Sequence, residues 1–223
     1  MTVKLFIEAI LKFTLGVVLI GALIFWPAGT LAFTGGWLLM GILFIPMFIA
    51  GFVMMAKDPS LLASRLDAKE KEKKQSIVVK LSGLMFIVGF VLAGLDFRFG
   101  WVKLPFAVNI VASVVFILAY IIYAEVLREN TYLSRTIKVV EGQKVISTGL
   151  YGIVRHPMYF ATILLFMSMP LVLGSLISFV VFLAYPFIIA ARIKNEEEVL
   201  SRELDGYDEY KKTVKYRMIP FIW

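Results

Sequence analysis

Long apolar runs are the feature of this 223-residue chain that most constrains its fold. Six apolar segments can be drawn, at residues 5–26, 36–56, 77–97, 104–127, 157–173 and 176–191. The first four are each long enough to cross ~30 Å of hydrocarbon as a helix that rises ~1.5 Å per residue. Only 17% of the residues are charged, whereas a soluble domain carries about 25%. We therefore predict an all-α, polytopic helical membrane protein with about six transmembrane segments. It would form a single domain over residues 1–223, with four helices in 1–127 and a hairpin and tail in 128–223.

The last two apolar segments differ from the others, because each is shorter than the ~20 residues that a full crossing needs. Gly174 and Ser175 join them, and Pro170 and Pro186 interrupt them. These features predict a tight helical hairpin that neighbouring helices partly shield. Beyond it, residues 196–216 carry alternating charges with apolar side chains at helical spacing. They predict a C-terminal helix that extends into the cytoplasm.

The net charge of +7 is distributed as the positive-inside rule predicts for alternating loops. Basic residues gather at 57–76, 128–155 and 192–223, whereas the loops at 27–35 and near residue 174 carry no charge. We therefore expect both termini in the cytoplasm of a multi-pass protein in the cell membrane of a prokaryote. The same distribution argues against nucleic-acid binding. The first apolar segment is longer than the core of a signal peptide, which predicts a retained helix.

The counts of cysteine and histidine exclude several kinds of site. The chain has no cysteine, which excludes disulfides, thiolate metal ligands and a cysteine nucleophile. Its single histidine excludes a metal site built from several histidines. We therefore expect no bound metal.

Two polar clusters beside the last two apolar segments are the candidate functional site. The turn-like run 148–159 contains the only histidine, His156, and the run 192–198 is dense in charge. Charged groups are costly at membrane depth, so clusters at the edges of apolar spans are candidate functional sites. A hairpin leaves one membrane face and returns to it, so the two clusters should meet at the cytoplasmic face. Glu125 and Asn130 are further candidates for the same pocket.

The chemistry of helix ends indicates what this pocket could bind. Pro157 is favoured at the first position of a helix, which places Arg155 and His156 at that helix's N-terminus. Unpaired N–H groups and the helix dipole attract anions there. Across from them, Glu196 and Glu197 can receive a cation. The predicted pocket therefore suits a zwitterion, such as the amino-acid end of a cofactor.

Each of these residues also has a plainer interpretation. Arg155 alone is more often a membrane anchor than a ligand, and His156 alone could be a helix cap. The acidic run at 196–198 alone is usually solvated helix surface. Tyr151 and Tyr159 could belong to the aromatic belt at a membrane interface. The coincidence of all these signals at both feet of one hairpin favours a site.

The two clusters together also form a motif found in a known family. It reads Gly149-x-Tyr151-x3-Arg155-His156-Pro157-x-Tyr159, then Arg192-x3-Glu196-Glu197-x2-Leu200, then Tyr207-x2-Tyr210. This pattern resembles the isoprenylcysteine carboxyl methyltransferase family. That family is part of a wider group of membrane methyltransferases that includes phospholipid N-methyltransferases. The resemblance covers residues 125–223.

The resemblance implies an S-adenosylmethionine-dependent methyl transfer at the boundary between membrane and cytoplasm. It implies that the strand-like run before the motif, the motif's first tyrosine, its His-Pro-x-Tyr segment and the first glutamate of the second cluster bind S-adenosyl-L-methionine. With the neighbouring Arg155 and Glu197, the predicted cofactor-binding residues are Gln143, Lys144, Val145, Ile146, Tyr151, Arg155, His156, Pro157, Met158, Tyr159, Glu196 and Glu197. Arg192 shares a helix face with Glu196, four residues later, and is implied to contact the substrate.

The acceptor is expected to be a lipid-like or prenylated small molecule that enters from the bilayer. A carboxylate is favoured, because it is already ionised at neutral pH and suits the planar fork of Arg192. A phospholipid amine is the first alternative. An NADPH-dependent membrane reductase is the second, because sterol and steroid reductases resemble this group distantly. A transporter or scaffold without enzymatic activity is the third.

Overall fold

The computed structural model describes residues 3–66, 73–133 and 139–223, and within these ranges all regular structure is helical. Five helical stretches are long and apolar enough to cross a membrane. They are α1 (Val3–Ala28), α2 (Thr34–Lys57), α4 (Lys73–Phe99), α5 (Phe106–Glu129) and the stretch Leu176–Glu203. A sixth apolar helix, α6 (Pro157–Val172), is shorter. The all-α, integral membrane class is therefore confirmed, while the count of six crossings stays a prediction. Part of the basic loop at 57–76 lies outside the described residues.

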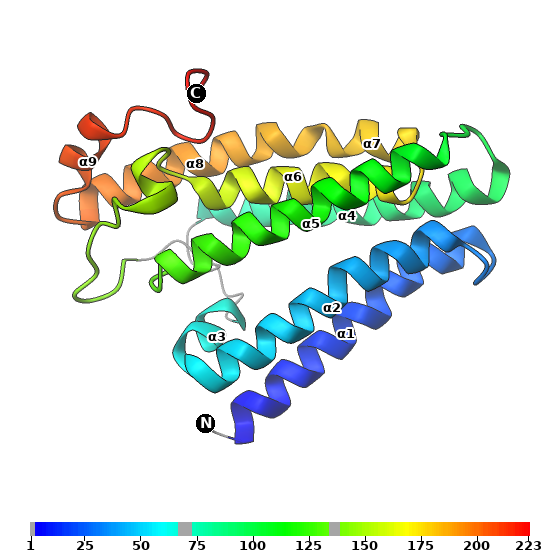
Figure 1. Cartoon of the computed structure of the whole chain (residues 1–223), viewed down its shortest axis with the longest axis horizontal. Coiled ribbons are helices and arrows are strands. Elements are labelled where there is room, and N and C mark those ends of the chain that lie inside the picture. Colours follow the sequence, from blue (N-terminus) through cyan, green and yellow to red (C-terminus); the bar gives the residue numbers. More distant parts are fainter. Residues whose placement is uncertain (1–2, 67–72, 134–138) are drawn as a thin grey trace.

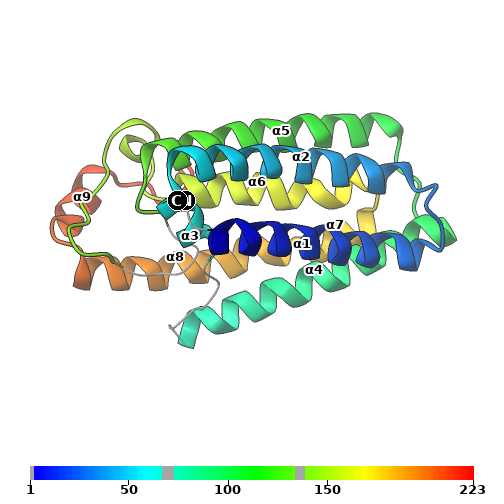
Figure 2. The same ribbon diagram turned by 90° about the horizontal axis from the view of Figure 1, so that it is seen from below.

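The long helices lie roughly side by side, so that the molecule has two ends (Figures 1 and 2). The α1–α2 and α4–α5 loops lie at one end, and both termini lie at the other. Short helix α3 (Pro59–Leu66) is also at the end that carries the termini. This arrangement agrees with termini on one side of a membrane, although the side itself stays a prediction.

The helices pack around one main apolar core. Phe116 of α5, Val172 of α6 and Ile193 are fully enclosed within it. Helix α1 approaches α4 closely at Gly94, where a Cβ would lie 2.6 Å from the carbonyl oxygen of Ile24. Small residues permit this kind of backbone approach between membrane helices.

The predicted hairpin is present, and its turn falls at the predicted place. Helix α6 ends at Val172, Gly174 adopts a φ of +76°, and the Ser175 hydroxyl accepts the N–H of Ser178 at 3.1 Å to cap α7 (Leu176–Phe182). The second arm is interrupted between α7 and α8 (Ala184–Glu203). The break follows from Pro186, because its ring clashes with the carbonyl four residues earlier and its nitrogen has no hydrogen to donate to that carbonyl. Pro170, in contrast, lies inside α6 without ending it.

The C-terminal helix predicted over 196–216 is not continuous. Helix α8 ends at Glu203, the chain turns at Gly206 with a φ of +82°, and α9 (Tyr207–Thr213) follows. The prediction was wrong on this point because the apolar side chains of this region form a cluster of their own. That cluster contains Leu204, Tyr207, Tyr210 and Val214, with Val139, Val145 and Leu200 packed against it. Helix α9 therefore folds back over the loop that contains Val145.

Candidate functional site

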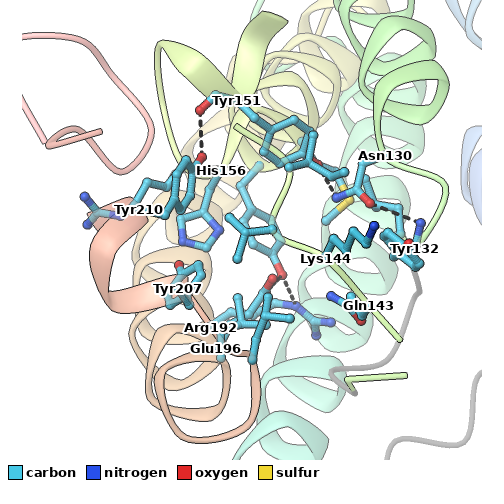
Figure 3. Close-up of a pocket in the computed structure, with 18 residues that line it drawn as sticks. Asn130, Tyr132, Gln143, Lys144, Tyr151, His156, Arg192, Glu196, Tyr207 and Tyr210 are labelled. Atoms are coloured by element: carbon cyan, nitrogen blue, oxygen red, sulfur yellow. Dashed lines mark hydrogen bonds between the residues drawn. The ribbon is translucent and has the colours of Figure 1, made fainter. Parts of the chain in front are cut away.

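A pocket lies where the start of α6, the end of α8, helix α9 and the loop before the motif meet (Figure 3). Both polar clusters from the sequence contribute to it, as the hairpin geometry predicted. Its lining residues are Asn130, Tyr132, Leu133, Gln143, Lys144, Val145, Ile146, Tyr151, Arg155, His156, Met158, Tyr159, Arg192, Glu196, Leu200, Leu204, Tyr207 and Tyr210.

The first glutamate and the arginine of the second cluster are joined through a tyrosine of the first. The Arg192 Nε–H donates to the Tyr159 hydroxyl oxygen at 2.8 Å, and the Tyr159 hydroxyl donates to the Glu196 carboxylate. Tyr159 is buried, whereas Arg192 and Glu196 are half-buried. Because Arg192 and Glu196 are four residues apart on α8, both face the pocket. The chain of three places a cation and an anion on one wall.

The second glutamate has a different environment. The Glu197 carboxylate accepts from Arg155 Nε at 2.8 Å, from Arg217 Nε at 2.8 Å, and lies 3.2 Å from His156 Nε2. The side chains of Glu197 and Arg155 are each 7% exposed. Glu197 and Pro157 are the two predicted cofactor residues that do not line the pocket. Glu197 instead lies behind it and holds His156 and Arg155.

The C-terminal segment fixes the start of α6 from the outside. The Tyr216 carbonyl accepts the N–H of Arg155 at 3.0 Å, and the Arg217 carbonyl accepts the N–H of His156 at 2.7 Å. Arg155 Nη1 donates to the Val214 carbonyl at 2.6 Å. The backbone of Arg155 and His156 is therefore held before α6 begins at Pro157, and the His156 ring is held by Glu197.

A short 3₁₀ helix, η1 (Gly149–Gly152), places Tyr151 in the pocket wall. Gly149 has a φ of +50°, and the Glu129 carboxylate accepts the N–H of Leu150 at 3.0 Å. A Cβ on Gly149 would lie 1.3 Å from a Glu129 oxygen, so a larger residue would displace the Glu129 carboxylate. Burial raises the pKa of the Tyr151 hydroxyl, which stays protonated. Sequence reasoning missed Glu129, whose only signal was its position at the end of the fourth apolar run.

Asn130 lines the pocket, as the sequence suggested, and its Nδ2 donates to the Tyr151 hydroxyl oxygen at 3.1 Å. Glu125 does not line it and instead forms a surface ion pair with Arg128 at 2.6 Å. The run 143–146 lines the pocket as a loop without strand pairing in the described part of the chain. The sequence did not predict ligand contacts for some of the lining residues, among them Tyr132, Leu133, Tyr207 and Tyr210. Of these, Tyr207 and Tyr210 belong to the sequence motif. Among the described residues no group of three or more acidic or histidine side chains could hold a metal.

Comparison with known families bears directly on this site. Residues 104–202 match the isoprenylcysteine carboxyl methyltransferase family. The match spans α5, η1, α6, α7 and nearly all of α8. It confirms the resemblance drawn from the sequence motif, and the family indicates a membrane methyltransferase.

A curated relative matches part of the chain. It is the Delta(14)-sterol reductase TM7SF2 of Mus musculus, which is 29% identical over 91 residues. Those residues are 40% of this chain and 22% of the reductase. The chain thus spans about a fifth of the length of the relative it matches.

Proposed function

We propose that this protein is an S-adenosylmethionine-dependent methyltransferase that acts on a lipid-like carboxylate at the boundary between membrane and cytoplasm. The observation that supports this most is the chain Arg192–Tyr159–Glu196 on the wall of a pocket at the feet of an apolar hairpin. The family match gives the reaction class. The arrangement supports a polar cofactor toward the loop side and an apolar acceptor along the membrane helices.

The side chains present suit the proposed cofactor. Its sulfonium is a cation, which the carboxylate of Glu196 and the electron-rich faces of Tyr151 and Tyr159 would stabilise. Val145 and Met158 offer apolar contact surface beside them. When bound, the cofactor supplies an electrophilic methyl group, which a carboxylate oxygen accepts as the carbon–sulfur bond breaks.

The protein's own contribution would be mainly to position the reactants. Because Tyr159 binds the Nε–H of Arg192, the guanidinium is oriented before the acceptor arrives. An oriented guanidinium can hold a carboxylate with its planar fork. An ionised carboxylate needs no general base, so holding the reacting atoms about 3–3.5 Å apart supplies most of the acceleration.

The first test is calorimetric binding of S-adenosylhomocysteine to detergent-purified protein, compared with Glu196→Gln and His156→Ala. We expect micromolar binding in the wild type and its loss in both variants. Glu203→Gln, a substitution on the exposed end of the same helix, is the matched control. Retained binding in both pocket variants would refute the placement of the cofactor.

The acceptor is tested with methyl-labelled cofactor and membrane lipid extracts. A methyl ester is released by mild base, whereas a methylated amine is not. Base-labile label in the lipid fraction would support the carboxylate, and base-stable label would establish the phospholipid amine alternative.

The partial match to a sterol reductase supports a second candidate, an NADPH-dependent reductase. The pocket is less suited to it, because a phosphate-rich cofactor needs several available cations and Arg155 is committed to Glu197 and to backbone carbonyls. Titration with NADPH separates the two. Binding of NADPH without binding of S-adenosylhomocysteine would replace the methyltransferase by the reductase.

A further inference from the structure

Tyr207, the first residue of α9, differs from the other buried tyrosines of the pocket. Its side chain is 4% exposed, and its hydroxyl is enclosed without a hydrogen-bond partner in residues 3–66, 73–133 and 139–223. The neighbouring hydroxyls are all engaged. Tyr210 donates to the Tyr151 carbonyl at 2.7 Å, Tyr151 accepts from Asn130 at 3.1 Å, and Tyr159 accepts from Arg192 at 2.8 Å.

An enclosed hydroxyl without a partner destabilises the protein that carries it. Phenylalanine would fill the same space in the cluster with Leu204 and Tyr210 without this cost. Packing therefore explains the ring of Tyr207 but not its oxygen. The oxygen is explained if it acquires a partner when the pocket is filled, since Tyr207 lines that pocket (Figure 3).

The charges around Tyr207 indicate which part of a ligand it would meet. Burial raises the pKa of its hydroxyl, and the Glu197 and Glu196 carboxylates raise it further, while Arg155 acts in the opposite direction. The hydroxyl is therefore protonated at neutral pH and can both donate and accept. Arg155 and Glu196 line the pocket here, and Glu197 lies behind Arg155, so this side of the pocket is charged and suits a zwitterion better than a nucleoside.

We propose that the Tyr207 hydroxyl is a cofactor-binding group that hydrogen-bonds the amino-acid end of the adenosyl cofactor. The inference rests on the proposed function and adds to it a contact from α9. It also gives α9 a role: the turn at Gly206 brings this hydroxyl over the pocket, which a straight continuation of α8 would not do.

The test compares Tyr207→Phe with the wild type against two ligands, S-adenosylhomocysteine and 5′-methylthioadenosine, which lacks the amino-acid end. We expect the Kd for S-adenosylhomocysteine to rise about tenfold, as for loss of one hydrogen bond to a charged group. The Kd for 5′-methylthioadenosine should stay unchanged. The melting temperature of the ligand-free variant should equal or exceed that of the wild type, because no internal hydrogen bond is lost.

Tyr210→Phe is the matched control, because it removes the hydroxyl that binds the Tyr151 carbonyl. Its ligand-free melting temperature should fall. A fall of the same size in Tyr207→Phe would overturn the inference, since it would reveal a structural partner. Unchanged S-adenosylhomocysteine affinity, or an equal loss with both ligands, would also overturn it. A wild type that binds neither ligand would instead refute the proposed function itself, and this inference with it.

Discussion

Replacing Glu197 with glutamine removes the negative charge on which two arginines and the only histidine converge. Oxygen Oε1 accepts from Arg155 at 2.8 Å and oxygen Oε2 accepts from Arg217 at 2.8 Å. A glutamine keeps the shape but has one carbonyl oxygen, so its NH₂ group must face one of the two N–H donors. The substitution leaves Arg155, which is 7% exposed at its side chain, without a counter-charge.

The expected size of the effect follows from these exposures. Breaking a buried ion pair by removing one partner costs about 3–5 kcal/mol. The side chain of Arg217 is 33% exposed, so water can compensate part of its loss. We therefore expect the lower limit, about 3 kcal/mol of unfolding free energy. At about 2–4 °C per kcal/mol for a chain of this size, the melting temperature should fall by about 6–12 °C.

The assay is thermal unfolding of the detergent-purified protein, followed by tryptophan fluorescence, beside binding of S-adenosylhomocysteine. Binding should weaken as well, because Glu197 also holds His156. Glu203→Gln, a surface change on the same helix, should alter stability by less than about 0.5 kcal/mol. Adding Arg217→Gln to Glu197→Gln should restore part of the lost stability, because it removes one uncompensated charge. If Glu197→Gln melts within about 2 °C of that surface control, which is the scatter expected of a surface change, the reasoning is refuted.

Three further changes test other parts of the structure. Arg192→Ala should lower turnover by about a hundredfold or more through lost positioning, with little change in S-adenosylhomocysteine affinity; equal losses of both would contradict its substrate role. Gly149→Ala forces the Glu129 carboxylate from the Leu150 N–H and should lower the melting temperature more than Gly142→Ala, whose Cβ would meet open space; equal changes would argue against a stabilising role of this hydrogen bond. Asp58 receives Ser60 Oγ–H and Leu61 N–H bonds that hold its pKa below the usual value. Asp58→Ala should therefore cost about 0.5–2 kcal/mol at neutral pH. Because the folded pKa is depressed, the ionised carboxylate stabilises the fold at pH values above its unfolded pKa of about 3.9. This stabilisation is lost as the pH falls through the folded pKa. The melting temperatures of the wild type and Asp58→Ala should thus converge in acid, and a pH-independent difference between them would exclude this role of the Asp58 carboxylate.

Much of the fold follows from local pattern. The four long apolar runs predict α1, α2, α4 and α5, because a helix satisfies its own backbone groups inside hydrocarbon. Gly174 and Pro157 likewise mark the hairpin turn and the start of α6, because their preferred backbone conformations are local properties.

The tail shows where local pattern fails. Its charges and spacing fit a continuous helix, yet the chain turns at Gly206. The free energy gained by burying Tyr207 and Tyr210 against Val145 depends on a loop some 60 residues earlier in the chain. The helical spacing of residues within the tail cannot predict such a distant contact.

The sequence by itself determined the membrane class, the hairpin and the meeting of two polar clusters, because hydropathy and helix-end chemistry depend on neighbours in the chain. Only the tertiary structure decided what each polar group does there. Glu196 and Glu197 are adjacent in sequence, but successive positions on a helix point in directions about 100° apart. One therefore faces the pocket with Tyr159, while the other is enclosed by Arg155 and Arg217. The difference between a ligand-facing carboxylate and a supporting one depends on which helices surround α8, and that is set by packing.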